Sequence, residues 1–463
     1  MSATVKAAEA SENVSVASVR SSAYPRAVIA WTTVAILFVL YVLSLLDRQL
    51  ISLLVQPIRR DLGITDFEVS LLSGFAFGVC YAICGLPIGW LVDRVSRRSV
   101  IFWGVMMWSM ATTLCGLAKN YFYLFLARIG VGAGEAALSP ASYSLLADTF
   151  PTNRLTLAVN IYSLGGPAGI GAAWIVGGLI VGNISGTSVD VPVFGAVRDW
   201  QLVFIVLGLP GALLAFLAFA LRERPREAPR AATNQPQSKL DLAEAFSFIW
   251  SRRRLFFCHH LGFTIANAGN TGMVIWYPAY MMRTYGWTPA QAGPTLGLVY
   301  VVGATLGLLL SGIGIDRSYG KGCTDAHMRW FAIWLVAATP LSVAGIMSGS
   351  PNFFLFTVFA LQVLIAGVQG IAAASLQIIA PSHLRGRLSA IFLFVTILLG
   401  IGMGPSVVAA FTDFVLRDDN KIGWSLILTS VTCFVGGAVL LWLGMAPLRA
   451  AVAEQRHRGT VIA

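Results

Sequence analysis

The stretch Gly89-Trp-Leu-Val-Asp93-Arg94-Val-Ser-Arg97-Arg98 follows a long apolar run, and Gly312-Ile-Gly-Ile-Asp316-Arg317-Ser-Tyr-Gly-Lys321 repeats its pattern. The two copies start 223 residues apart in a chain of 463, so each falls at the equivalent place of one half. A weaker echo links 151–154 with 381–387. An internal repeat of this kind predicts two structurally equivalent halves.

The composition around these motifs is that of a membrane protein. Hydrophobic residues make up 57% of the chain and charged residues only 11%. Such a chain has too little polar surface for a water-soluble globule, so most of its solvent must be lipid.

The apolar stretches can be counted against the thickness of a bilayer. Crossing a hydrocarbon core takes about 20 apolar residues per helix, and the uncharged stretches provide this length twelve times. We therefore expect an all-α membrane protein with two pseudo-symmetric bundles of six transmembrane helices. The predicted helices lie near 28–56, 67–92, 99–118, 121–148, 155–182 and 200–221, and near 255–282, 288–315, 329–349, 352–380, 388–413 and 423–447.

Lysine and arginine predict the orientation. With both termini inside, the cytoplasmic segments carry 23 of the 32 basic residues and the outer loops carry seven. This bias fits the positive-inside rule and also accounts for the net charge of +11 without a nucleic-acid partner. We expect a multi-pass protein of the cell inner membrane with both termini cytoplasmic.

These boundaries predict five parts: a cytoplasmic tail (1–27), an N-terminal bundle (28–221), a cytoplasmic linker (222–254), a C-terminal bundle (255–447) and a second cytoplasmic tail (448–463). The linker combines proline, glutamine and eight basic residues. Within it, the segment from Leu240 to Trp250 predicts a short amphipathic helix on the membrane face.

The motif G-x-L-x-D-R-x-x-R-R at 89–98 resembles the signature loop of the major facilitator superfamily, although Ser96 stands where that family usually has glycine. The resemblance implies twelve helices that alternate access by rocking two bundles. The carboxylate of Asp93 is expected to face the positive dipole end of the eleventh helix, and Arg97 is expected to pair with Asp148. We expect the gate to comprise Asp93, Arg94, Arg97, Asp148, Arg154, Asp316 and Arg317; topogenic charge is the alternative role for Arg94 and Arg98.

Four charged residues lie in the interior of the predicted helices, away from their ends, where a charge costs roughly 2.5–3.5 kcal/mol even on permissive scales. They are Asp47, Arg48, Arg128 and Glu135. Helical rise places Asp47 and Arg48 about 12–14 Å, and Arg128 and Glu135 about 10 and 21 Å, from the predicted outer helix ends. All four should therefore share one layer of the membrane.

We assign substrate binding to Arg48 and Arg128, which would hold an anionic head group. We expect Asp47 and Glu135 to take up and release the coupled protons, because a buried carboxylate that loses its partner and its water gains a proton readily. The alternative is a permanent ion-pair network that fixes the first helix against the fourth.

A narrower resemblance covers most of the N-terminal half. Leu46-Asp47-Arg48, Asp61-Leu62-Gly63, Arg128-Ile-Gly-Val-Gly-Ala-Gly-Glu135-Ala136 and the 148–154 loop resemble the Spinster family. This likeness implies functional roles for Asp47, Arg48 and Glu135, and an amphipathic anion such as a lysolipid or a sphingosine-phosphate-like molecule as substrate. The same features also resemble organic-anion symporters, so carboxylates such as sugar acids stay open.

The C-terminal half offers neutral amides in place of charges. Asn267 and Asn270 in the seventh helix and Gln362 and Gln369 in the tenth are candidate substrate-binding residues. Interhelical hydrogen bonding is an equally good role for each. The sequence has no metal-ligand spacing and no catalytic motif. We therefore expect no enzymatic activity, no catalytic or metal-binding residues and no cofactor. A sensor or channel on the same fold is the more distant alternative, and we expect a monomer.

Overall fold

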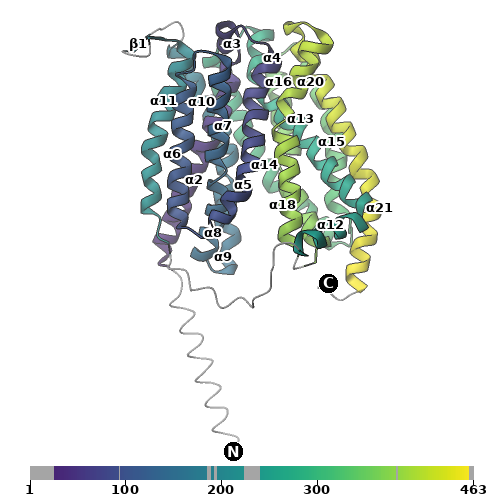
Figure 1. The fold of residues 1–463 in the computed structure, drawn as a ribbon. Coiled ribbons are helices and arrows are strands. Elements are labelled where there is room, and N and C mark those ends of the chain that lie inside the picture. Colours follow the sequence, from purple (N-terminus) through teal and green to yellow (C-terminus); the bar gives the residue numbers. More distant parts are fainter. Residues whose placement is uncertain are drawn as a thin grey trace, which may run out of the picture.

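The computed structural model describes residues 25–92, 94–184, 189–191, 195–223, 240–381 and 384–457. Within them the chain is a bundle of long helices (Figure 1). Among the described residues, ten helical stretches are long and apolar enough to cross a membrane. Two further helices, α6 and α13, pack among these ten, which confirms the predicted all-α membrane fold.

The N-terminal half contains α2 (Ala27–Gln49), α3 (Ile51–Leu62), α4 (Asp66–Ser70), η1 (Leu71–Phe75), α5 (Ala76–Val92), α6 (Arg97–Cys115), α7 (Tyr121–Glu135), α8 (Leu138–Thr149), α9 (Thr152–Ser163), α10 (Gly165–Ile184), β1 (Val189–Val191), β2 (Gly195–Val197), α11 (Asp199–Leu214) and η2 (Ala215–Ala220). The two short strands pair antiparallel.

The C-terminal half is preceded by α12 (Leu240–Ser251) and contains α13 (Arg253–Tyr285), α14 (Pro289–Gly320), α15 (Ala326–Met347), α16 (Pro351–Ile365), α17 (Val368–Ile379), α18 (Arg385–Val395), η3 (Thr396–Ile401), α19 (Gly404–Ala410), η4 (Phe411–Leu416), η5 (Asp419–Lys421), α20 (Ile422–Ser430), η6 (Val431–Val435) and α21 (Gly436–His457). The short linker helix predicted at 240–250 is confirmed by α12.

Several helices are broken, and one of the breaks repeats between the halves. The fourth span breaks between α7 and α8 at Ala136 and Ala137, and the tenth breaks between α16 and α17 at Ala366 and Gly367. The first span breaks at Leu50. A break frees backbone carbonyls at membrane depth, which is tolerated only where the protein itself supplies donors.

Two predicted helix ends were wrong. The first span continues to Leu62 through Pro57, where we expected a loop after residue 56. It then ends at Gly63, whose φ of +66° is the left-handed conformation that terminates helices. The twelfth stretch is longer than 423–447, because α21 continues to His457. Polar residues can extend a helix beyond the bilayer, which an apolar window does not detect.

The two ends of the bundle differ. The start of α2 and the end of α21 lie at one end, with α12 (Figure 1). We call this the predicted cytoplasmic end, and the opposite end the predicted outer end.

The halves are tightly packed toward the predicted outer end. Between α10 and α14, a Cβ added at Gly178 would lie 2.6 Å from the carbonyl oxygen of Pro289, and one at Gly293 would overlap the carbonyl oxygen of Trp174. Near the predicted cytoplasmic end of α14, a Cβ added at Gly312 would meet nothing within 4 Å. At that end α8 and α9 stand apart from α18 (Figure 1). The halves therefore separate toward the predicted cytoplasmic end.

Candidate functional site

Arg128 holds the broken first span in place. Its Nε donates to the carbonyl oxygen of Leu72 at 3.1 Å, and its two terminal nitrogens donate to the carbonyl oxygens of Asp47 (3.4 Å) and Arg48 (3.3 Å). The side chain is fully buried. Because the helix break at Leu50 and the π-helix η1 disturb the regular backbone pattern, these carbonyls are able to accept from a side chain. Arg128 thus connects three helices through backbone oxygens.

Arg48 forms an ion pair with Glu135. Its Nη2 lies 3.0 Å from Glu135 Oε2, which also accepts from the hydroxyl of Ser44 at 2.8 Å. The guanidinium lies over the ring of Phe77, 4.1 Å from the centroid. The Arg48 side chain is 17% exposed, whereas that of Glu135 is fully buried. Arg48 is therefore the more accessible member of this pair.

The side chain of Asp47 points toward α6, away from Glu135. Its Oδ2 accepts from Thr112 of α6 at 3.4 Å, and its Oδ1 has no hydrogen-bond partner among the described residues. Neighbouring residues on a helix point about 100° apart, so Arg48 can face Glu135 while Asp47 faces α6. A buried carboxyl group that forms no ion pair is costly when ionised, and a proton removes that cost.

These contacts bring the four charged residues of the predicted layer together, but in unequal positions. Arg128 donates to backbone carbonyls and forms no ion pair among the described residues, so it fixes the first span against the fourth by hydrogen bonds and not by the ion pairs of the alternative. Arg48 alone among the four is partly exposed. Their roles in substrate binding and proton coupling stay predictions.

The predicted amide residues of the C-terminal half lie on three helices, with Asn267 and Asn270 on α13, Gln362 on α16 and Gln369 on α17. Gln362 Nε2 donates to Asn270 Oδ1 at 3.2 Å. Gln362 Oε1 and Asn267 Nδ2 are buried without a partner among the described residues, while Gln369 is exposed on α17.

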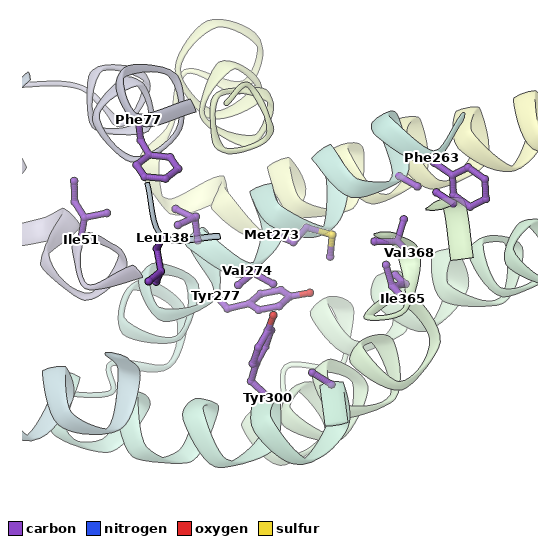
Figure 2. Close-up of a cluster of buried hydrophobic side chains, with 14 of the residues drawn as sticks. Ile51, Phe77, Leu138, Phe263, Met273, Val274, Tyr277, Tyr300, Ile365 and Val368 are labelled. Carbon is purple, nitrogen blue, oxygen red and sulfur yellow. The ribbon is translucent and has the colours of Figure 1, made fainter. Parts of the chain in front are cut away.

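Aromatic side chains lie nearby. Figure 2 shows Tyr277 of α13 and Tyr300 of α14 with their hydroxyl groups turned toward each other, beside Met273 and Val274. Trp174 of the N-terminal half packs edge-on against Tyr300, with ring centroids 5.4 Å apart. The two halves thus meet through aromatic rings close to the amide pair.

The predicted gate residues are only partly paired. The structure contains the expected ion pair between Arg97 and Asp148, and the guanidinium of Arg94 lies over the ring of Trp90, 3.9 Å from its centroid. Asp93 lies outside the described residues. The exposed residues Arg154, Asp316 and Arg317 form no ion pair within the described ranges.

A cap on α6 was not predicted. Glu223 accepts from the hydroxyl of Ser96 at 2.6 Å and from the backbone N–H of Arg97 at 2.9 Å. Burial alone would raise the pKa of Glu223, but these hydrogen bonds hold that pKa below its ordinary value. The end of the sixth span is thereby fixed to the start of the third.

A cluster of ion pairs at the predicted outer end was also missed. Asp66, fully buried, accepts both terminal nitrogens of Arg283 at 2.6 and 2.7 Å, and Arg59 Nη1 at 3.0 Å. Arg59 also pairs with Asp419 at 2.8 Å, and Asp413 accepts from the backbone N–H of Phe67 at 2.7 Å. We call Arg59, Asp66, Arg283, Asp413 and Asp419 the outer ionic cluster; it joins the two halves.

The local sequence explains the position of Asp66 at the start of α4. Thr65 and Glu68 form a capping box that starts α4 immediately after the turn at Gly63. Carboxylate oxygens of Asp66, Asp413 and Asp419 lie within 4.8 Å of one another, a spacing at which carboxylates can hold a cation. The guanidinium groups of Arg59 and Arg283 already occupy that position as counter-charges.

Long apolar helices around buried charged side chains define a polytopic membrane protein. The chain belongs to the Major Facilitator Superfamily, whose family model matches residues 37–405. The superfamily resemblance of the 89–98 motif is thereby confirmed.

Curated relatives span nearly the whole chain. An "MFS-type efflux pump" of Mycolicibacterium smegmatis is 26% identical over 92% of this chain and 95% of its own length. "Protein spinster homolog 1" of Xenopus laevis is 25% identical over 90% of this chain and 80% of its own. A "D-galactonate transporter" of Escherichia coli is 25% identical over 80% of this chain and 86% of its own.

A solved structure shares the fold. It is a bacterial homologue of the human lysosomal transporter Spinster, in an inward-facing, unoccupied conformation, with a TM-score of 0.74 and 24% identity over 93% of this chain and 98% of that one. Together with the Xenopus relative, it confirms the predicted likeness to Spinster proteins.

Proposed function

We propose that this transporter moves an amphipathic anion by alternating access, coupled to protons. The carrying observation is the ion pair of Arg48 with Glu135, in which the arginine alone is partly exposed. An anion that reaches Arg48 competes with Glu135 for the same guanidinium. A proton on Glu135 removes that competition, so anion and proton bind together.

The surroundings of Arg48 support an amphipathic substrate. The guanidinium stacks on Phe77, and Tyr81, partly exposed, lies within 5.9 Å of it. Aromatic faces beside a cation suit a molecule with an anionic head and an apolar body. Lysolipids and sphingosine-phosphate-like molecules both combine an anionic head with an apolar body.

Two features of the structure support a mechanism of alternating access. The halves are bound at the predicted outer end by the outer ionic cluster and separate toward the predicted cytoplasmic end. We assign this arrangement to an inward-facing state, in which Arg48 is reached from the cytoplasm. The buried carboxyl of Asp47 would hold a second proton, behind the first span.

Small organic anions such as sugar acids are the second candidate. Asn270 and Gln362 give the C-terminal wall hydrogen-bonding groups that suit hydroxyl groups better than an acyl chain. The D-galactonate transporter among the relatives points the same way.

Proteoliposomes test both candidates. Purified protein is reconstituted and supplied with a labelled lysolipid or with labelled D-galactonate, with and without a pH gradient. We expect saturable lysolipid uptake that falls when the gradient is dissipated and that Arg48→Ala abolishes. Arg417→Ala is the matched control, since Arg417 is exposed at the predicted outer end. Uptake of galactonate alone would select the second candidate, and pH-independent exchange would refute proton coupling.

A further inference from the structure

Two thiols lie side by side on α5. Cys80 and Cys84 are four residues apart, so they project from the same face of this helix. Their sulfur atoms are 3.7 Å apart, and both residues are partly exposed. The structure thus presents two accessible thiols that a single atom can bridge.

The other four cysteines offer no such pair. Cys115, Cys258 and Cys433 are buried, and Cys323 donates a hydrogen bond to Asp325. A reagent that needs two adjacent thiols therefore has one place to bind on this chain.

The spacing of the two thiols does not suit a disulfide. Cβ atoms four residues apart on a helix are about 5–6 Å from each other, whereas a disulfide brings the Cβ atoms to about 3.5–4.5 Å. Closing that bond would deform α5. A bridging atom avoids the deformation, because it inserts its own two bonds between the sulfur atoms.

The geometry also limits which atom can bridge. An atom about 2.3 Å from each sulfur, the length of a zinc–thiolate bond, would have an S–X–S angle of about 107° at the observed sulfur separation of 3.7 Å. A structural zinc ion needs four ligands, but among the described residues no His, Asp or Glu joins this pair in a metal-binding group. A trivalent arsenic atom that carries one organic substituent needs only two sulfur atoms to complete its three bonds.

We propose that Cys80 and Cys84 together bind monosubstituted trivalent arsenicals, R–As(OH)2. Two As–S bonds form and two As–O bonds break, and the two hydroxyl groups leave as water with the two thiol protons. Arsenic stays trivalent and no electrons are transferred. Because the sulfur atoms already lie at bridging distance, α5 keeps its helical backbone.

The bound arsenical lies beside the candidate functional site. Tyr81 is three residues before Cys84, and residues three apart are neighbours on a helix surface. Tyr81 in turn lies within 5.9 Å of the Arg48 guanidinium. Cys84 is seven residues beyond Phe77, so it lies about 10 Å further from the predicted outer end at the rise of an α-helix. The substituent on arsenic is therefore added on the side of the site that faces the predicted cytoplasmic end.

Phenylarsine oxide, whose hydrated form is phenyl–As(OH)2, tests the site. Purified protein is incubated with it in detergent, with an excess of a monothiol that removes adducts on single cysteines, and is analysed by intact-protein mass spectrometry. We expect one phenylarsenic group per chain and two thiols protected from a maleimide. Cys80→Ser and Cys84→Ser should each weaken binding by about 100-fold or more, because the second sulfur acts at a high effective concentration.

Cys323→Ser is the matched control, since it removes a partly exposed cysteine that has no neighbouring thiol. It should bind phenylarsine oxide as the unmodified protein does, and so should a variant that keeps only Cys80 and Cys84. Each variant is measured on the monodisperse fraction from size-exclusion chromatography, so that misfolded protein does not contribute.

Undiminished binding in Cys84→Ser, or no protected thiols in the unmodified protein, would overturn the proposal. Loss of binding in Cys323→Ser would do the same. These measurements need no transport substrate, so they stand or fall separately from the proposed function.

Discussion

Removing Arg283 should open the predicted outer end. Arg283 donates two short bonds to the fully buried Asp66, and when it is removed Arg59 is the one ion-pair partner left among the described residues. Breaking a buried pair outright costs about 3–5 kcal/mol. Because Arg59 still neutralises Asp66, we take about 2 kcal/mol for Arg283→Ala, which corresponds to a roughly 30-fold shift in the closed-to-open ratio.

The shift in the closed-to-open ratio can be measured at a serine that is buried in the closed state. Ser70 and Ser406 meet across the two halves at 3.0 Å, and Ser70 is fully buried. In a background without the six native cysteines, Ser70→Cys is labelled with a membrane-impermeant maleimide. The labelling rate should rise by about the same 30-fold in Arg283→Ala, provided that reclosing is fast.

Arg417→Ala supplies the control, because it removes an exposed arginine at the same predicted end without touching the outer ionic cluster. Its labelling rate should match that of the parent. An unchanged rate in Arg283→Ala, or an equal rise in the control, would refute the assignment of the outer ionic cluster as the closure of this end.

Three further changes test other contacts. Glu135→Gln should leave substrate counterflow intact but reduce the response of uptake to a pH gradient; an unchanged response would exclude Glu135 as a coupling site. Gly293→Ala should lower the Tm measured in detergent, since overpacking costs typically 1–3 kcal/mol; an unchanged Tm would contradict the close approach of α10 and α14. Burial raises the pKa of Asp325, but hydrogen bonds from Arg329 and ion pairing with Arg449 hold it below its ordinary value. This stabilisation is present above a pH of about 4 and is lost as the pH falls through the folded-state pKa, so Asp325→Asn should lower Tm at pH 7 and flatten its acid-side decline.

Much of the fold followed from the sequence because its signals are local. Apolar stretches of bilayer length predict transmembrane helices wherever they occur, and the repeated motifs at 89–98 and 312–321 indicated two halves. Helix ends were less predictable: α3 continues through Pro57 and α21 extends past the apolar window. Beyond the hydrocarbon, helix length depends on caps such as Gly63 and on packing, not on hydropathy.

The charged layer was predictable for a similar reason, since an ionisable residue in an apolar helix stands out against its neighbours. Helical rise also predicted that Asp47, Arg48, Arg128 and Glu135 share one layer. It did not show that Arg128 would be occupied by backbone carbonyls, because those carbonyls become available only where the first span breaks and η1 packs beside it.

By itself the sequence determined the membrane class, the two-half repeat and which residues carry charge into the bilayer, because hydrophobicity and charge are properties of single residues and short windows. Only the tertiary structure decided which charges meet. Asp66 and Arg283 are 217 residues apart and lie at helix ends, where charge is common. Their pairing depends on how two separate bundles dock, and no local pattern encodes that geometry.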